Sequence, residues 1–469
     1  KMSDPATKAK VKEFFKRMKK LNLSPTPVET PPSSRKPVRR TISRTTLDRL
    51  YNRRNTLTSP RNHNRIASGA RRGGPMSMEW DPENPPAVVI DHGSGVMKAG
   101  FGIASESTMR PQLINSFVGR PKYSRSMIGA TRRSILVGRR CTRMMGILKL
   151  SYPIAGEAVT SWDDLEHIWN DVYEDRLRAN PSSHPVLMTE PPLAPMKNRL
   201  KKAEIFFENF RVPSICLQLP QMLALYASGH TTGLVVDSGD TMTKAVPIYE
   251  GKYNPSAVCR IPVAGRHVTK YLAKLLNEQG YKFHTSAEME VVKRIKHKAC
   301  QTAFVLRKTE KEFDDIDELP GFKLPDGKVI KIGLEKFKAP ELMFKPSLLG
   351  LKYPGVHEIT VNAVAKCATD IRRQVFSQIL LAGGTTCSRG FGIRLLSEVR
   401  RIGKFTKFSI SAPENRVELA WLGGSILASL SIFKGMSTTR EEYQEMGAQA
   451  FYKKRLDTVA QNVARSSTI

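Results

Sequence analysis

The sequence AVVIDHGSGVMK, residues 87–98, contains the first strong structural signal of this chain. Apolar residues with high strand propensity precede an acidic residue and a glycine-rich turn. A second stretch, LVVDSGDTMTK at residues 234–244, repeats the order of apolar run, aspartate, glycine and lysine. Asp91 and Asp237 each precede a glycine by two positions and a lysine by seven. This internal repeat predicts two similar domains that face each other.

Both stretches are typical of a hairpin that binds phosphate. Glycine at the bend exposes backbone N–H groups, which can cradle phosphate oxygens. Mg²⁺ keeps several waters and uses few carboxylates, so we expect Asp91 and Asp237 to hold it through water. Lys98 can neutralise the phosphate tail. One such hairpin alone is usually structural, whereas two in register predict a nucleotide site.

A third element completes this set. The stretch QILLAGGTT, residues 378–386, places a strand before two glycines, and a helical pattern begins near Gly390. Such a turn lets a nucleoside approach the backbone closely, although a plain strand-to-helix connection is the alternative. The chain contains neither a P-loop sequence nor a dinucleotide fingerprint. The phosphate site is therefore of the paired-hairpin type.

The composition limits the class of protein. The 469 residues include 75 Lys+Arg and 43 Asp+Glu, which give a net charge of +32. Residues 1–80 hold 20 of the basic and 5 of the acidic residues and are rich in Pro, Ser and Thr, which predicts a mostly disordered basic arm. No apolar stretch approaches the ~18 residues of a membrane span, and no secretory signal is visible. The six cysteines are scattered without a CxxC pair, which indicates reduced thiols.

One part of the arm, near residues 5–21, has the pattern of a short amphipathic helix. Asp4 can cap it, and Val11, Phe14, Phe15, Met18 and Leu21 follow at helical spacing among lysines. We expect this apolar stripe to meet an acidic surface, such as a membrane, or a protein groove. The alternative is that it docks on the folded body of the same chain.

The chain resembles actin over about residues 87–456. The segment DHGSGVMKAGF, residues 91–101, is similar to the first phosphate loop of that family. The other segments that carry the resemblance are YPI (152–154), TSWDDLE (160–166), HPVL (184–187), LYASG (225–229), VPIYEG (246–251), LPDG (324–327) and WLGGSILASL (421–430).

The resemblance implies a two-lobed α/β fold with a central nucleotide cleft, which actins share with sugar kinases and heat-shock chaperone ATPases. The cofactors would be ATP and Mg²⁺. The expected division is the arm (1–80), a first lobe (87–226) with an inserted loop near residues 120–140, a second lobe (227–420), a return to the first lobe (421–456) and a tail (457–469).

Family positions carry over to individual residues of this chain. Asp91 and Asp237 would hold the metal through water, and the catalytic positions would be Asp237 and Gln221. The residues that match nucleotide-pocket positions are Asp91, Gly93, Ser94, Gly95, Lys98, Asp237, Gly239, Asp240, Gly265, Lys296, Gly383, Gly384 and Thr385.

Several pocket positions depart from the family. Pro220 replaces the glutamine that orients water, with Gln221 adjacent, and Lys244 replaces the histidine beside the attacking water. The other departures are Gly156 for His, Thr241 for Gly, His297 for the ribose-binding Glu, and Ser388 and Val417 for the residues that flank adenine. Each lost adenosine contact is worth about 1 kcal/mol, so ATP binding should weaken without vanishing. Hydrolysis should suffer more, because positioning a water contributes about 10²-fold.

The chain keeps some of the residues that match the filament-forming surface of actin. The positions that match the hydrophobic cleft for the next subunit and for actin-binding proteins are Tyr226, Gly229, Thr231, Ile426, Leu427, Leu430 and Met436. For Ile426 and Leu430, ordinary core packing is an equal alternative. The inserted loop keeps apolar Met127 and Ile128, and Phe344, Leu348 and Leu349 match an apolar plug between filament strands.

The leading hypothesis is an actin-related protein of the cytoplasm and cytoskeleton. It would bind ATP–Mg²⁺, hydrolyse it slowly at most, and polymerise with itself or actin or decorate actin filaments. Its charge would steer it towards an acidic filament. The first alternative is a nuclear subunit of a chromatin-associated complex, which is disfavoured because no nucleic-acid module is recognised. The second is an active ATPase of the same fold.

Overall fold

A computed structural model describes residues 85–102, 110–122, 135–306, 309, 321–324, 327–403 and 407–451. All of them belong to the larger of two compact units, which comprises residues 1–28 and 83–469. The predictions for the arm, for its helix near residues 5–21, for residues 123–133 of the inserted loop and for the tail lie outside the described residues.

The first sheet has six strands and is built around β1. Its core strands β1, β8 and β9 are parallel, whereas β2 returns antiparallel to β1 and β3 pairs with β2. The strand order is β18 (Thr438–Thr439), β9 (Ser214–Gln218), β8 (Val186–Thr189), β1 (Val88–Asp91), β2 (Val96–Phe101) and β3 (Gln112–Asn115). The hairpin β1–β2 contains the first aspartate–glycine–lysine motif.

The second sheet repeats this plan. Strand β10 is parallel to β16, and β11 returns antiparallel to β10. The strand order is β12 (Lys252–Tyr253), β11 (Thr243–Tyr249), β10 (Gly233–Ser238), β16 (Gln378–Ala382) and β17 (Ser409–Ser411), with β13 (Cys259–Ile261) on β11. The three predicted strands at residues 87–90, 234–236 and 378–382 correspond to β1, β10 and β16 and are confirmed.

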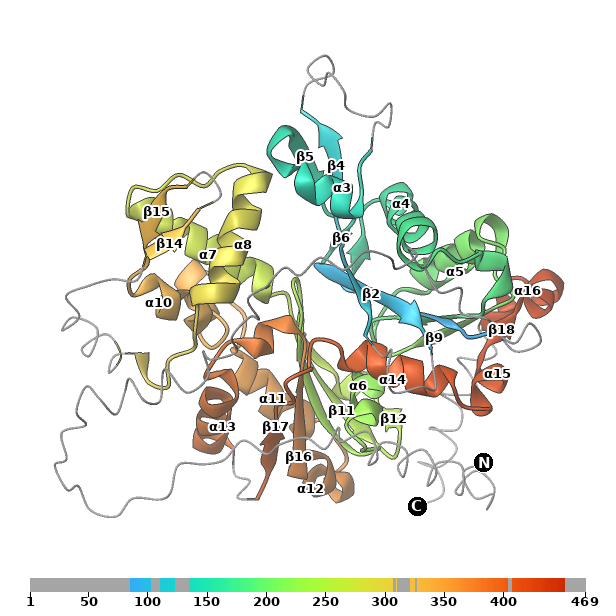
Figure 1. The fold of residues 1–469 in the computed structure, drawn as a ribbon. Helices are drawn as coiled ribbons and strands as arrows, with labels where there is room; N and C mark the ends of the chain where they lie inside the picture. Colours follow the sequence, from blue (N-terminus) through green and yellow to red (C-terminus); the bar gives the residue numbers. More distant parts are fainter. Residues whose placement is uncertain are drawn as a thin grey trace, which may run out of the picture. The chain divides into compact units, whose positions relative to one another are not determined.

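Two helices lie between the sheets. Helix α6 (Pro220–Ala227) packs against α14 (Leu419–Ala428), and their core includes Val89 of the first sheet and Val235 of the second. Both helices are apolar on nearly every side, which is typical of buried helices. Figure 1 shows them between the strands of the two sheets. Helix α6 ends and helix α14 begins near residues 226–227 and 420–421, where the sequence predicts the lobe boundaries. These boundaries remain a prediction.

Of the other helices, α11, α12 and α13 pack against strands of the second sheet, whereas α7, α8 and α10 form a group with β14 and β15 (Figure 1). Ser161 accepts a hydrogen bond from the Asp164 N–H and so caps α4, and Thr285 forms a capping box with Glu288 at the start of α8. The helices on the first sheet include α4 (Trp162–Asp171) and α5 (Met196–Glu204). Those of the second core include α7 (Gly265–Glu278), α8 (Ser286–Ala299), α10 (Glu335–Glu341), α11 (Val356–Ala365), α12 (Thr369–Ser377) and α13 (Phe391–Ile402).

Smaller elements complete the described part. They are the hairpins β4–β5 (Val118–Pro121 with Leu148–Ser151), β6–β7 (Ile154–Ala155 with Ala158–Val159) and β14–β15 (Gly321–Lys323 with Val329–Lys331), and the helices α3 (Gly138–Arg143), α15 (Ile432–Met436) and α16 (Arg440–Met446). Among the described helices, none has the length and apolar character to cross a membrane.

Candidate nucleotide-binding site

The first hairpin presents a paired carboxylate and ammonium. Asp91 and Lys98 are direct partners in the β1–β2 register, and Lys98 Nζ lies 2.9 Å from Asp91 Oδ2. Thr189, at the end of β8, donates to Asp91 Oδ1 at 2.9 Å. Burial opposes the charged form of Lys98, but the carboxylates of Asp91, Asp237 and Glu418 together outweigh it and raise the pKa of the ammonium. Lys98 therefore stays cationic at neutral pH, as phosphate binding requires.

The second hairpin repeats the register but not the pairing. Asp237 faces Lys244 across β10–β11, yet the Lys244 ammonium pairs with Glu157, 2.9 Å away. Gln221 instead donates to Asp237 Oδ2 at 2.7 Å. Burial raises the pKa of Asp237, and the Lys244 charge and the Gln221 amide partly offset this shift. The negative charge of the Asp91 carboxylate adds to the upward shift of the Asp237 pKa.

The turns of the two hairpins touch. Ser94 Oγ and Thr241 Oγ1 share a hydrogen bond of 2.9 Å, and Thr241 donates to the Gly156 carbonyl at 3.1 Å. A side chain at Gly95 would place its Cβ 2.7 Å from Asp240 Cβ, so this close approach requires glycine. These contacts connect segments of both sheets.

Arg266, at the start of α7, strengthens the junction between the hairpins. Its guanidinium lies 2.6 Å from Asp240 Oδ2 and donates to the Ser94 carbonyl at 3.3 Å. It also lies over the Tyr152 ring, 4.2 Å from the ring centroid. Arg266 is thus a cation of the site that sequence reasoning missed.

The third predicted element meets the second hairpin. Gly383 follows β16 with φ of +84°, and a Cβ there would lie 2.3 Å from the Ser238 carbonyl oxygen. Thr385 donates to the Gly239 carbonyl at 2.6 Å, and Lys296 donates to the Gly265 carbonyl at 2.8 Å. Burial, opposed in part by Asp240, lowers the pKa of Lys296 to about 8. The structure therefore brings the predicted pocket residues together around these three turns.

The donor set fits a hydrated magnesium ion. Asp91 and Asp237 supply two carboxylates at strand ends, and the buried Oε1 of Gln221 has no hydrogen-bond partner among the described residues. A metal-bound water can donate to such an acceptor. In the described part of the chain, no group of three or more His, Cys, Asp or Glu side chains is arranged so that it could hold a metal ion. Phosphate and water would therefore have to complete the coordination of Mg²⁺.

The expected nucleoside side offers weaker contacts. Ser388 Oγ shares a hydrogen bond of 3.0 Å with Thr302 Oγ1, so part of its hydroxyl capacity is already used. His297 is exposed near the end of α8, and Val417 is half-buried and apolar. Ser388 and Val417 provide no aromatic ring, and none of the three side chains provides a carboxylate for a nucleoside.

The predicted partner cleft is only partly open. Ile426 and Leu427 are 6% exposed and belong to the core around α6 and α14, which favours core packing for them. The half-buried residues at the edge of that core are Tyr226, Gly229, Thr231, Leu430 and Met436. Burial raises the pKa of the Tyr226 hydroxyl to about 12. Phe344 of the predicted plug is also buried, against Phe391, whereas Leu348 is exposed.

Two further residues of the site were missed by sequence reasoning. Thr189 follows another apolar run, and the ends of neighbouring parallel strands share a sheet edge, so this signal could have revealed it. Glu157 lies in the turn between β6 and β7, where its sequence neighbourhood contains no recognisable motif.

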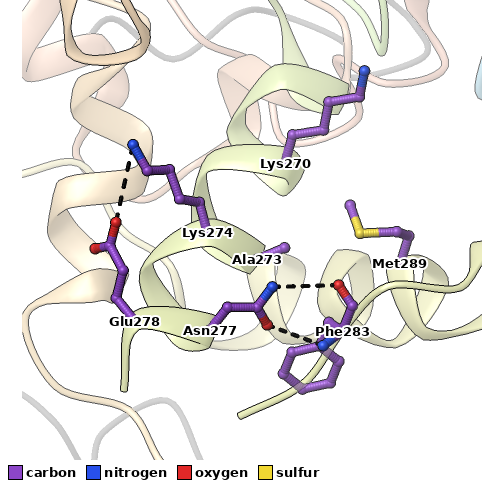
Figure 2. Close-up of a pocket in the computed structure, with 7 residues that line it drawn as sticks. All are labelled: Lys270, Ala273, Lys274, Asn277, Glu278, Phe283 and Met289. Carbon is purple, nitrogen blue, oxygen red and sulfur yellow. Dashed lines mark hydrogen bonds and ion pairs between the residues drawn. The ribbon is translucent and has the colours of Figure 1, made fainter. Parts of the chain in front are cut away.

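A separate pocket of about 480 Å³ lies on α7 and the start of α8. Figure 2 shows Asn277 holding the backbone of Phe283 through two hydrogen bonds, of 2.9 and 3.5 Å. The residues that line it are Lys270, Ala273, Lys274, Asn277, Glu278, Phe283 and Met289. None of the predicted nucleotide-binding residues is among them, so this pocket is separate from the paired-hairpin site.

Comparisons with known proteins agree with this architecture. Residues 83–456 match the family model described as actin. An actin-like protein of Neurospora crassa is 45% identical over 364 residues, which cover 76% of this chain and 95% of that protein. These matches confirm the two-lobed α/β fold and the resemblance seen in the sequence. The chain is a divergent member of the actin family.

Proposed function

We propose that the chain binds ATP–Mg²⁺ between its two hairpins and joins or decorates actin filaments as a cytoskeletal protein of the cytoplasm. The observation that carries this proposal is the convergence of both aspartate–glycine–lysine hairpins and the Gly383 turn. Charge-assisted contacts to phosphate are about twice as strong as neutral ones, and the residues that make them are present. ATP binding therefore survives the weaker nucleoside contacts.

Each part of the site would have a defined role. Lys98 would neutralise the phosphate chain, and the backbone N–H groups of the turns at Gly93–Gly95 and Ser238–Thr241 would hold its oxygens. Asp91, Asp237 and Gln221 would hold the hydrated Mg²⁺, which supplies charge neutralisation when bound. Lys296 would add a second cation near the Gly265 turn.

Hydrolysis is expected to be slow. Pro220 has no side-chain amide that could orient a water, and Gln221, whose Nε2 donates to Asp237, is assigned to the water shell of Mg²⁺ rather than to the attacking water. Lys244 carries an ammonium, which has no acceptor for a hydrogen bond from the attacking water. The chain thus resembles a nucleotide-stabilised structural protein more than an efficient ATPase.

A filament role rests on the half-buried residues Tyr226, Gly229, Thr231, Leu430 and Met436 and on charge. A net charge of +32 favours association with an acidic filament through electrostatic steering. Co-sedimentation of the full chain with conventional actin tests this role. It should pellet with filaments at low salt and release partly at high salt, because screening weakens surface charges. If the chain stays in the supernatant at every salt concentration and in every nucleotide state, the filament role is contradicted.

The arm is proposed to target the protein to an acidic surface, either a filament or a membrane. Deleting residues 1–80 should leave ATP binding unchanged and disperse the protein in cells. Replacing Phe14 and Phe15 by glutamate should reproduce part of that loss, since it removes apolar contacts that salt does not screen. If the truncated chain localises like the full chain, the arm has no targeting role.

A further inference from the structure

Positive charge is concentrated in one segment of the folded body. Residues 107–156 contain ten Lys+Arg and no Asp or Glu, and they hold over half of the excess positive charge of residues 81–469. The described part of this segment includes β3, the hairpin β4–β5 and α3. Because the segment has no acidic residue of its own, its surface has a single sign of charge unless other segments neutralise it.

Helix α3 and the hairpin β4–β5 share a small core. Figure 1 shows α3 beside the two strands. The buried residues of this core are Phe117, Leu136, Cys141, Leu148 and Leu150. The apolar side chains therefore fill the inside, which leaves the charged side chains on the surface.

The exposed side of α3 has three arginines, Arg139, Arg140 and Arg143. The first turn of the helix contains no acidic residue, and none of the three guanidinium groups forms an ion pair with a residue that the structure describes. Like charges three or four positions apart on a helix repel each other. A bound anionic surface would relieve this repulsion.

The neighbouring hairpin adds two lysines. Arg120 and Lys149 are direct partners across β4–β5, although like charges at opposite positions destabilise a sheet. Asp164 neutralises Arg120 at 2.5 Å, whereas Lys149 is exposed and forms no ion pair within the described ranges. Lys122 follows β4, and its backbone N–H donates to the Ile147 carbonyl at 3.2 Å. Both lysines thus lie close in the chain or in the hairpin to Ile147.

Ile147 places an exposed apolar side chain among these cations. It is 49% exposed and follows the end of α3 by four residues, and Met144 and Met145 beside it are half-buried. Cations around an exposed apolar residue are typical of proteins that bind membrane surfaces. The cations meet anionic headgroups, and the apolar side chain enters the boundary between headgroups and acyl chains.

We propose that this exposed side of the module docks on an anionic phospholipid membrane. It is separate from the nucleotide site and from residues 1–80, so it goes beyond the proposed function. The residues that form it, named here the basic face, are Lys122, Arg139, Arg140, Arg143, Ile147 and Lys149.

The chemistry of the basic face selects this partner. A single sign of charge attracts an anionic surface without fixing a register, whereas a protein interface uses a pattern of complementary charges. The phosphate backbone of a nucleic acid would leave Ile147 without an apolar partner, and the basic face has no aromatic ring on which a base could stack. A lipid surface satisfies both the cations and Ile147.

Flotation of the full chain with phosphatidylcholine vesicles, prepared with and without phosphatidylserine, tests the proposal. The wild type should bind only the vesicles that contain phosphatidylserine. The triple variant Arg139→Gln, Arg140→Gln and Arg143→Gln should bind at least about tenfold more weakly, because each lost charge costs up to about fivefold. Replacing the same three arginines by lysine keeps the charge and should retain most of the binding.

Two further variants separate the basic face from the net charge of the chain. Lys352→Gln, Lys366→Gln and Arg373→Gln together remove the same charge from exposed positions elsewhere and should stay within about twofold of the wild type. Ile147→Ser keeps the charge but should weaken vesicle binding about threefold or more, because about half of an isoleucine side chain would otherwise leave water.

Hydrogen exchange with and without the anionic vesicles locates the contact independently of the arm. Amides of residues 138–149 should exchange more slowly when vesicles are present. Protection confined to residues 1–80, or equal vesicle binding by the wild type and the arginine-to-glutamine variant, would overturn the proposal. Tighter binding to duplex DNA than to vesicles, unchanged by Ile147→Ser, would also overturn it in favour of a nucleic acid.

A second variant keeps the proposal testable if the arginine-to-glutamine variant fails to fold. Lys122→Gln with Lys149→Gln changes only exposed side chains of the hairpin and should weaken vesicle binding about tenfold. Unchanged binding by this pair would overturn the basic face. The nucleotide site does not enter any of these measurements, so their failure leaves the proposed function untouched.

Discussion

Asp91 and Lys98 form an ion pair of 2.9 Å across the first hairpin, in a site where both side chains are nearly buried. Desolvation makes each of these charges costly when alone, so each stabilises the other. The pair also holds the ammonium beside the turn that would receive phosphate. We therefore expect the same contact to affect both folding stability and the proposed phosphate binding.

Lys98→Met should lower the free energy of unfolding by about 2–4 kcal/mol, because it leaves the Asp91 carboxylate buried and unpaired. Chemical denaturation without nucleotide measures this loss. Lys366→Met removes the same charge from an exposed position and should stay within about 0.5 kcal/mol of the wild type. Equal stability of the two variants would mean that the ion pair contributes nothing to the fold.

Gly383→Ala should destabilise the chain by about 2 kcal/mol or more and weaken nucleotide binding. The backbone there has φ of +84°, and the added Cβ would lie 2.3 Å from the Ser238 carbonyl oxygen. The neighbouring Gly384→Ala is the matched control, since its Cβ would meet nothing within 4 Å. Thermal unfolding of both variants measures the effect. Similar melting temperatures would contradict the prediction that a side chain at position 383 strains the turn.

Nucleotide affinity should fall as the pH rises through about 8. Burial lowers the pKa of Lys296 to about 8, and a bound phosphate would raise it again because it favours the charged form. Full affinity is therefore expected below pH 8, with roughly a tenfold loss by pH 9.5. Lys296→Met should bind more weakly at pH 7 but lose this pH dependence, as measured by titrations across pH 7–9.5. An unchanged pH profile in the variant would exclude Lys296 as the group responsible.

Phosphate release under polymerising conditions should be well below that of conventional actin. The double variant Pro220→Gln with Lys244→His restores a side-chain amide and a neutral imidazole, so its release rate should rise about tenfold or more. Single-turnover measurements with saturating ATP–Mg²⁺ separate this effect from binding. A wild-type rate equal to that of conventional actin would contradict the assignment of slow hydrolysis to these two positions.

The strands that contain the motifs were predictable because their signal is local. An apolar run that ends in Asp–X–Gly specifies a strand and a turn regardless of distant residues, and β1 and β10 lie where such runs occur, whereas β16 lies where an apolar run ends in two glycines. The helix expected near Gly390 likewise begins at Phe391, after a glycine with φ of +83°. The burial of Ile426 could also be anticipated, since α14 is apolar on nearly every side.

Contacts between distant segments were not predictable in the same way. Glu157 reaches Lys244 only because the β6–β7 turn and β11 meet in the folded chain, and no spacing encodes that meeting. The role of Gln221 likewise depends on how α6 packs. Pro220 stands at the sequence position of the family's water-orienting glutamine, but the amide of the neighbouring Gln221 donates to Asp237 Oδ2 at 2.7 Å. Single-sequence patterns describe elements, whereas a site also depends on how those elements pack.

Titration of the full chain with ATP–Mg²⁺ tests the central claim most directly, with Asp237→Asn as the site variant and the exposed Asp175→Asn as its matched control. We predict saturable binding of one nucleotide, weakened at least about tenfold by Asp237→Asn and unchanged by Asp175→Asn. Absence of binding at millimolar ATP–Mg²⁺, or equal affinity in the wild type and Asp237→Asn, would contradict a nucleotide site between the two hairpins.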